Sequence, residues 1–297
     1  MKRMPPAFAL LAATIFTVAL ALPAQAQLKL PRVSPSAKVT QTVGTTDLTV
    51  TYSRPGAKGR VIWGELVPYD KVWRTGANEA TTFTTTDPIQ FGGKPLAAGT
   101  YELFSLPGKD EWQVIVSDTT GQWGSDQYDP KKDVMRVAVK PTPIDPPQEW
   151  MEFSFEDMTP GSLTIGPNST NLVLRWEKLR IAVPIVVDVN GKVLAQARAA
   201  MDTLKSDDWR SPYQAANFCF ANDLALDEAR QWLDKSLSIQ QTYGNLGLQA
   251  RWQMKEGRKD EAIKTAQKAL EVAAASKVKP DTSALEKLLA EWTGEKK

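Results

Sequence analysis

The residues best suited to bind or transform a ligand are concentrated in one stretch of the sequence, residues 53–82. Its cations and large aromatic residues are Arg54, Lys58, Arg60, Lys71, Arg74, Trp63, Tyr69 and Trp73. An arginine offers a planar fork of N–H donors that fits a carboxylate or a phosphate, and it also stacks on aromatic rings. Long irregular stretches inside a compact domain are often functional, and this one is too aromatic for disorder.

We therefore expect a site for an anionic or sugar-like ligand in this stretch, with an indole ring as a stacking wall. Asn78 adds both a donor and an acceptor. The candidate ligand-binding residues are Arg54, Arg60, Trp63, Trp73, Arg74, Asn78 and Glu79. A structural interpretation stays open beside this one, in which Arg74 pairs with Glu79 beneath packed tryptophans and no ligand is needed.

The amino-acid composition excludes several classes of catalytic site. The chain has no histidine and a single cysteine, Cys219, which excludes a Ser-His-Asp triad, a Cys-His pair and the usual catalytic zinc sites. The acidic residues show no calcium-loop spacing and there is no phosphate-binding glycine loop, so we expect no metal and no cofactor. Carboxylates pair in space rather than in sequence, so a carboxylate mechanism stays open, with Glu65 and Glu79 as first candidates.

Residues 38–188 are expected to form the domain that positions this stretch, an antiparallel β-sandwich. Apolar residues alternate with polar ones over short runs, as Leu48, Val50 and Tyr52 alternate with threonines. Such alternation is typical of half-buried strands, and turn residues separate the runs. Several short strands at this spacing indicate a sandwich or a barrel.

The apolar period changes to that of helices near residue 190, and residues 191–293 are expected to form a helical domain. Residues 225–237 align with residues 258–270 at an offset of 33, so that Ala229 matches Ala262. This pattern resembles the tetratricopeptide repeat, in which small residues let paired helices approach closely. A helical bundle that repeats by chance is the other interpretation. A groove in such repeats is expected to take a protein or peptide.

Residues 1–26 have the features of a cleavable signal peptide. Lys2 and Arg3 precede an apolar run that Pro23 ends, and a small-x-small pattern places cleavage between Ala26 and Gln27. The run is shorter than the roughly 20 residues of a membrane-spanning helix, which argues against a retained anchor. We expect a periplasmic or secreted protein that does not span the membrane after cleavage, with a linker at residues 27–37.

The charge balance limits the partners. The chain has 36 Lys and Arg against 34 Asp and Glu, and without Lys2 and Arg3 the two totals are equal at 34. A neutral mature chain has no electrostatic footprint for nucleic acid, so no nucleic-acid partner is expected. One cysteine cannot form an internal disulfide, and stability must therefore come from packed cores.

The β part resembles the bacterial exported family called domain of unknown function 2911. The matching segments are Tyr52–Pro55, Lys58–Arg60, Leu66–Tyr69, Val72–Thr81 (VWRTGANEAT), Ala98–Tyr101, Gln122–Gly124 and Trp176–Glu177. The resemblance covers about residues 38–188, and Asp70 departs from it because the family favours a small residue there. Membership implies an exported β-rich domain, sometimes followed by helical repeats. It implies no established activity, so no catalytic residue is carried over.

The function favoured by these features is that of an exported, non-catalytic binding or scaffolding protein of the cell envelope. The second hypothesis is a histidine-independent hydrolase or lyase that acts on an envelope polymer or glycan. In that hypothesis Glu65 or Glu79 serves as acid or base and Arg74 stabilises negative charge.

Overall fold

The computed structural model describes residues 30–159 and 167–294. The predicted signal peptide, with its cleavage point between Ala26 and Gln27, lies outside the described residues. The same holds for the first residues of the predicted linker at 27–37.

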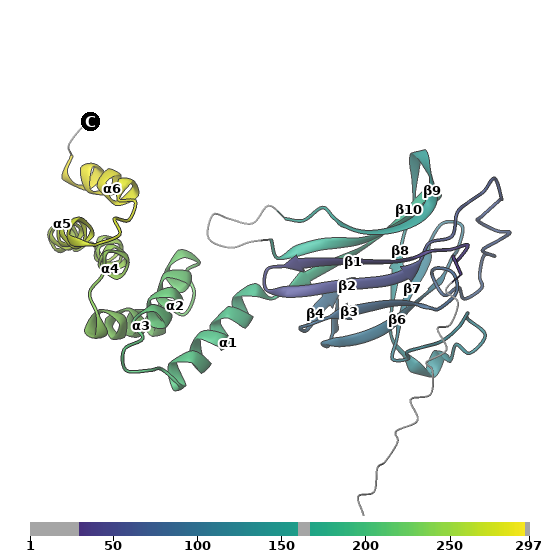
Figure 1. Ribbon diagram of the computed structural model, residues 1–297, viewed down its shortest axis with the longest axis horizontal. Coiled ribbons are helices and arrows are strands. Elements are labelled where there is room, and N and C mark those ends of the chain that lie inside the picture. Colours follow the sequence, from purple (N-terminus) through teal and green to yellow (C-terminus); the bar gives the residue numbers. More distant parts are fainter. Residues whose placement is uncertain (1–29, 160–166, 295–297) are drawn as a thin grey trace, which may run out of the picture. The chain divides into compact units, whose positions relative to one another are not determined.

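Six strands form one antiparallel sheet in the order β1-β2-β3-β6-β7-β8 (Figure 1). The strands are β1 (Ser36–Val43), β2 (Thr46–Ser53), β3 (Thr81–Thr85), β6 (Gly99–Leu106), β7 (Trp112–Ser117) and β8 (Asp133–Val139). In β2 the side chains of Leu48, Val50 and Tyr52 are buried, while Thr49 and Thr51 between them are half-buried. The alternation in the sequence thus gives this strand one face toward a core.

Four strands form a second antiparallel sheet in the order β5-β4-β10-β9. They are β4 (Ile89–Phe91), β5 (Lys94–Leu96), β9 (Thr142–Glu156) and β10 (Ser169–Val187). The pairing of β9 with β10 shifts register on both sides of Glu177, which has a φ of 53°. Register shifts of this kind change the direction in which neighbouring side chains point. Trp176 immediately precedes Glu177 and therefore lies at this shift.

Side chains of both sheets share one hydrophobic core. Phe83 and Leu103 come from the six-stranded sheet, and Phe91 and Leu174 come from the four-stranded sheet. The prediction of antiparallel β structure in this part of the chain is confirmed, and neither sheet closes into a barrel.

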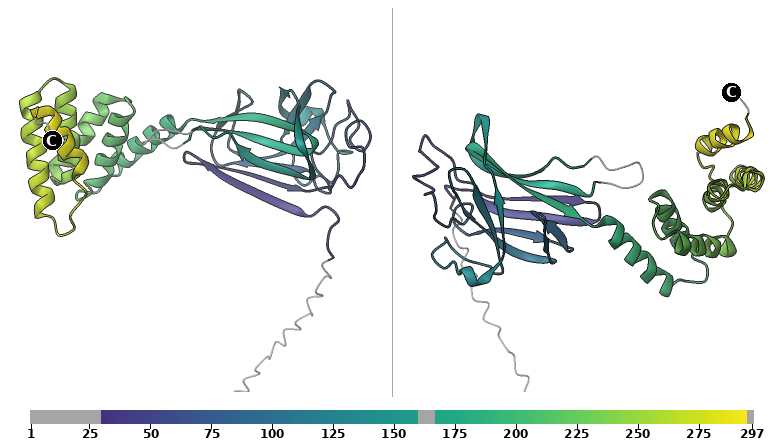
Figure 2. Two further views of the ribbon diagram at one scale, coloured as in Figure 1. Left: turned by 90° about the horizontal axis from the view of Figure 1, so that it is seen from above. Right: turned by 180° about the vertical axis from the view of Figure 1, so that it is seen from behind.

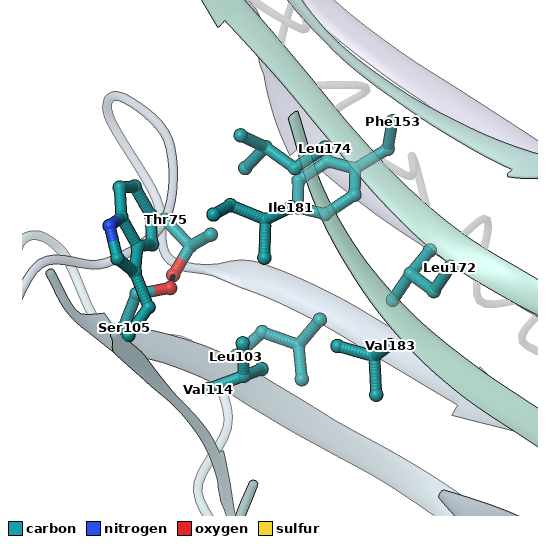
Figure 3. Close-up of a pocket in the computed structure, with 10 residues that line it drawn as sticks. Thr75, Leu103, Ser105, Val114, Phe153, Leu172, Leu174, Ile181 and Val183 are labelled. Carbon is teal, nitrogen blue, oxygen red and sulfur yellow. Dashed lines mark hydrogen bonds between the residues drawn. The ribbon is translucent and has the colours of Figure 1, made fainter. Parts of the chain in front are cut away.

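A small cavity remains inside this core (Figure 3). Its volume is about 20 Å³, and apolar side chains such as Leu103, Leu174 and Val183 line most of it. The hydroxyls of Thr75 and Ser105 face each other at its edge and are hydrogen-bonded at 2.7 Å. A space of this size holds a single water at most, so this cavity is a packing feature rather than a ligand site.

Six α-helices follow in the described residues (Figure 1). They are α1 (Val189–Asp202), α2 (Arg210–Ala221), α3 (Leu226–Ile239), α4 (Tyr243–Lys255), α5 (Lys259–Ala275) and α6 (Ser283–Thr293). Helix α2 packs against α3 and α4 packs against α5 as hairpins, and α6 packs on α5 (Figure 2). None of the helices in the described residues is both long and apolar enough to cross a bilayer.

The sequence offset of 33 corresponds to equivalent places in the two hairpins. Ala229 near the start of α3 and Ala262 near the start of α5 are both fully buried. Gly257, with a φ of 80°, permits the turn between α4 and α5. Cys219 is buried as well, and this burial raises the pKa of its thiol. These contacts agree with close helix pairing and with a core role for the cysteine.

Replacing Ala229 or Ala262 with leucine is expected to lower the free energy of unfolding of the helical part by about 1–3 kcal/mol, because the paired helix leaves no room for the larger side chain. Urea unfolding followed by far-ultraviolet circular dichroism measures the change. The matched control is Ala274→Leu, which adds the same atoms at an exposed position of α5. Equal stabilities of all three variants would contradict the role assigned to the two buried alanines.

Candidate functional site

The segment between β2 and β3 contains no strand or helix of its own. Isolated bridges pair its Gly56 with Trp150 of β9 and its Trp73 with Ser105 of β6, so it contacts both sheets. Four of its non-glycine residues have positive φ, between 51° and 58°: Lys58, Asp70, Thr75 and Asn78. Aspartate and asparagine tolerate this region better than most residues, which suits Asp70 and Asn78. Unfavourable backbone conformations of this kind concentrate at functional sites.

Thr75 is the least expected of these four, because β-branched residues strongly disfavour positive φ. Its hydroxyl is hydrogen-bonded to that of Ser105, and its carbonyl accepts a hydrogen bond from Thr81 Oγ1 at 2.8 Å. These buried contacts hold the turn in place. Arg74 and Gly76, on either side of Thr75, line the pocket described below.

Four tryptophans form a cluster where this segment meets the two sheets. Trp63 and Trp73 come from the segment, Trp112 from β7 and Trp176 from β10. Trp73 and Trp176 are stacked, with ring centroids 5.9 Å apart and planes 23° apart, while Trp63 and Trp112 meet edge-on at 4.9 Å. Such pairs each add about 0.5–1.5 kcal/mol beyond the burial of their area. The cluster therefore anchors the segment to both sheets.

The indole N–H groups of this cluster are mostly unpaired. Trp73 Nε1 donates to the carbonyl of Gly76 at 3.0 Å. The Nε1 atoms of Trp63, Trp112 and Trp176 are buried without a hydrogen-bond partner among the described residues. Buried polar groups without partners are rare in native proteins and call for an explanation.

A pocket of about 330 Å³ lies beside the cluster, and we call it the tryptophan pocket. Trp73 and Trp176 form part of its wall, and the cations that line it are Lys58, Arg60 and Arg74. Its lining, as far as the structure describes it, contains no carboxylate. An open site with three cations, two stacked indoles and no acid is suited to an anion that also has a flat apolar part.

Arg74 is the most unusual cation of the tryptophan pocket. Burial lowers the pKa of its guanidinium, and the charge of Asp126 acts in the opposite direction. Its Nε is buried without an acceptor, and no ion pair within the described residues includes it. None of these ion pairs joins Arg74 to Glu79, which is the pairing that the structural interpretation requires. Among the described residues the charge of Asp126 acts on this guanidinium without forming an ion pair with it, and a half-buried charge so placed is unfavourable in the absence of a ligand.

The other two cations have partners, Arg60 in its own segment and Lys58 in β9. Arg60 donates from Nη2 to the carbonyl of Gly56 at 2.6 Å and from Nε to that of Ala57 at 3.1 Å. The ammonium of Lys58 lies 5.8 Å from the ring centre of Trp150, and the backbone N–H of Lys58 donates to Glu149 at 2.8 Å. Carbonyls of its own segment therefore position Arg60 at the pocket, and contacts with β9 position Lys58 there.

Three of the seven candidate ligand-binding residues, Arg60, Trp73 and Arg74, line the tryptophan pocket. The others do not line it. Arg54 binds the carbonyl of Met151 at 2.8 Å and Glu152 at 3.2 Å, and Trp63 packs within the cluster. Asn78 donates to the carbonyl of Ser34 at 3.1 Å.

The two candidate acids lie elsewhere as well. Glu65 and Glu79 are exposed, neither lines the pocket, and the backbone of Glu79 bridges to Trp123. Within the described part of the chain, no cluster of three or more potential ligands is placed to hold a metal.

Lys58 and Trp176 line the pocket although neither is among the candidate ligand-binding residues. Lys58 belongs to the cationic stretch and could have been included on that ground. Trp176 is about a hundred residues away in the sequence, and only strand pairing brings it to the site.

The model of one protein family matches this chain over residues 34–185, and its description is "Protein of unknown function (DUF2911)". The match includes the segment between β2 and β3 and all four clustered tryptophans. No curated protein and no solved structure matches the chain.

Replacing Arg74 with methionine is expected to leave stability unchanged or to raise it by up to about 1 kcal/mol. Methionine keeps an apolar stem and removes an unpaired charge, although solvent partly screens that charge. Arg54→Met is the control, because Arg54 has two partners and its loss should destabilise the protein by about 1 kcal/mol. Urea unfolding measures both variants, and a clear destabilisation by Arg74→Met would contradict the absence of a compensating partner.

Proposed function

The chain belongs to the DUF2911 family, and we propose that it is a non-catalytic binding protein whose tryptophan pocket holds a small anionic ligand. One observation carries this proposal. Three cations and two stacked tryptophans line a pocket of about 330 Å³ that has no carboxylate in its described lining. That volume is within the range of small-molecule sites, roughly 300–1,000 Å³.

The arrangement favours a ligand with a carboxylate or phosphate group and a flat apolar part. Arg74 offers donors that no protein group in the described residues accepts from, and a ligand oxygen would complete them. The flat part would lie against the indoles at the pocket wall. A neutral ligand of the same shape would leave Arg74 unpaired, so it should bind less tightly.

The hydrolase or lyase hypothesis has less support. Acid–base catalysis needs a carboxylate within hydrogen-bond reach of the reacting group. Glu65 and Glu79, which were proposed for this role, do not line the tryptophan pocket.

We also propose that the protein is exported and that its helical part is a tetratricopeptide-like module for a protein or peptide partner. The sequence of residues 1–26 supports export. The repeat offset of 33 and the two hairpins with equivalent buried alanines support the second role.

Ligand binding can be tested with benzoate, phenyl phosphate and the neutral benzamide, using quenching of tryptophan fluorescence. Saturable quenching by at least one of the two anions is expected, with benzamide at least tenfold weaker. Arg74→Gln should weaken anion binding at least tenfold, because it removes a charge-assisted hydrogen bond of about 1.5–3 kcal/mol.

The matched control for Arg74→Gln is Lys71→Gln, an exposed cation of the same segment that does not line the pocket. Its affinity for the anions should remain within twofold of the unmodified protein. Equal binding of benzoate and benzamide, or equal losses in the two variants, would refute an anion site at Arg74.

Export makes a separate prediction about the mature chain. Intact-mass analysis of protein recovered from the periplasm or culture medium should give a chain that begins at Gln27, because signal peptidase cuts after a small-x-small pattern. Ala26→Leu should block this cut and leave the longer chain. Recovery of the longer chain from the unmodified gene would contradict cleavage.

A further inference from the structure

The side chains that line the tryptophan pocket provide hydrogen-bond donors rather than acceptors. Lys58, Arg60 and Arg74 contribute cationic donors, and no carboxylate lines the pocket as far as the structure describes it. An ammonium or a guanidinium group donates hydrogen bonds but cannot accept them. The pocket can therefore pair the oxygens of a ligand, but its charged side chains cannot pair a proton that the ligand donates.

Backbone carbonyls of the lining residues already accept hydrogen bonds within the protein. The carbonyl of Gly56 accepts from Arg60 Nη2 at 2.6 Å, and that of Gly76 accepts from the indole Nε1 of Trp73 at 3.0 Å. The carbonyls of four further lining residues also accept from protein donors: Ser34, Pro55, Val67 and Arg74. A ligand donor at any of these oxygens would have to share an acceptor that is already engaged.

Two carboxylates act on lining residues from outside the pocket. Glu149 of β9 accepts a hydrogen bond on Oε1 from the backbone N–H of Lys58 at 2.8 Å. Asp126 acts on the guanidinium of Arg74 through its charge. Neither Glu149 nor Asp126 is part of the described lining. A carboxylate that could accept from an ammonium or a hydroxyl group of a ligand is therefore missing from that lining.

This arrangement distinguishes two kinds of anion that have the same charged group and the same ring. In an aromatic carboxylate or sulfonate, the anionic oxygens accept hydrogen bonds and no polar hydrogen is left over. An amino acid has an ammonium group beside its carboxylate, and a hydroxy acid has a hydroxyl group there. Either donor would lose its water on binding without gaining a free acceptor, which weakens binding. The three cations of the lining would also repel the ammonium group.

We propose that the tryptophan pocket selects aromatic carboxylates and sulfonates that have no hydrogen-bond donor next to the anionic group, over amino acids and hydroxy acids. This inference rests on the anion-binding function proposed above and names the class of ligand. The stacked rings of Trp73 and Trp176 provide the surface for the ligand's ring. The lack of a carboxylate in the described lining provides the discrimination.

The test compares three ligands that differ at one substituent of the carbon next to the carboxylate. This substituent is a methyl group in 2-phenylpropanoate, a hydroxyl group in mandelate and an ammonium group in phenylglycine. Each is titrated into the full mature chain at neutral pH by calorimetry, in both enantiomers. 2-Phenylpropanoate should bind saturably, mandelate about fivefold or more weaker and phenylglycine about tenfold or more weaker, because an unpaired donor costs more when it is charged.

A new acceptor in the lining should reduce this discrimination. Leu66 lines the pocket and its side chain is exposed, so Leu66→Glu adds a carboxylate without disturbing a core. In this variant the preference for 2-phenylpropanoate over phenylglycine should fall about fivefold or more, because the ammonium group gains a charged partner.

The matched control is Val61→Glu. Val61 is exposed, its carbonyl accepts from the backbone N–H of Leu66 at 3.3 Å, and it does not line the pocket. The same charge is thus added beside Leu66 but outside the lining. The preference for 2-phenylpropanoate should stay within about twofold of that of the unmodified protein, since a charge near the surface acts weakly through solvent.

The failures are distinguishable. If neither benzoate nor 2-phenylpropanoate binds saturably, the anion-binding function fails together with this inference. If the three ligands bind alike, or if benzoate binds and 2-phenylpropanoate does not, the selection is overturned and the anion-binding function stands. An unchanged preference in Leu66→Glu, or an equal change in Val61→Glu, also overturns it, because the missing acceptor would then not be the cause.

Discussion

The contact on which the β part depends is the cluster of Trp63, Trp73, Trp112 and Trp176. It joins the long segment between β2 and β3 to strands of both sheets, so one group of rings fixes three parts of the fold. The rings stabilise through area and edge contacts, but three of their four N–H groups have no acceptor in the described residues. An unpaired buried donor costs about 1–3 kcal/mol. Ring packing in the cluster therefore stabilises the fold, and the unpaired indole N–H groups offset part of that stabilisation.

The proposed site lies next to this cluster, where the backbone and Arg74 are both in unfavourable states. The hydrogen bonds of Thr75 with Ser105 and Thr81, and that of Trp73 Nε1 with the carbonyl of Gly76, hold the turn at Thr75 in a conformation that a β-branched residue disfavours. Arg74 and Gly76 are placed on either side of that turn, and Arg74 carries a charge that no described ion pair compensates. Violations of local preference that the surrounding fold enforces are expected where a protein has a function.

The strands, the helices and part of the candidate site could be predicted from the sequence. Strands such as β2 and the helices are predictable because each leaves a local period of apolar residues in the sequence. The cationic, aromatic character of residues 53–82 pointed to Arg60, Trp73 and Arg74 because those residues are close in sequence. Trp176 could not be placed, since its position depends on the register of β10. Arg54 and Asn78 were included for their chemistry, but their partners, Met151 and Ser34, are distant along the chain.

The half-buried charge of Arg74 has a thermodynamic consequence for the β part. Burial lowers the pKa of this guanidinium, and the ion pairs of the described residues do not include it. The free protein therefore bears the cost of a partly desolvated charge, and a bound anion would reduce that cost. Binding to the folded state alone stabilises that state in proportion to the logarithm of ligand concentration over Kd. An anion at Arg74 should therefore stabilise the fold around Trp73 and Trp176, which belong to the core of the two sheets.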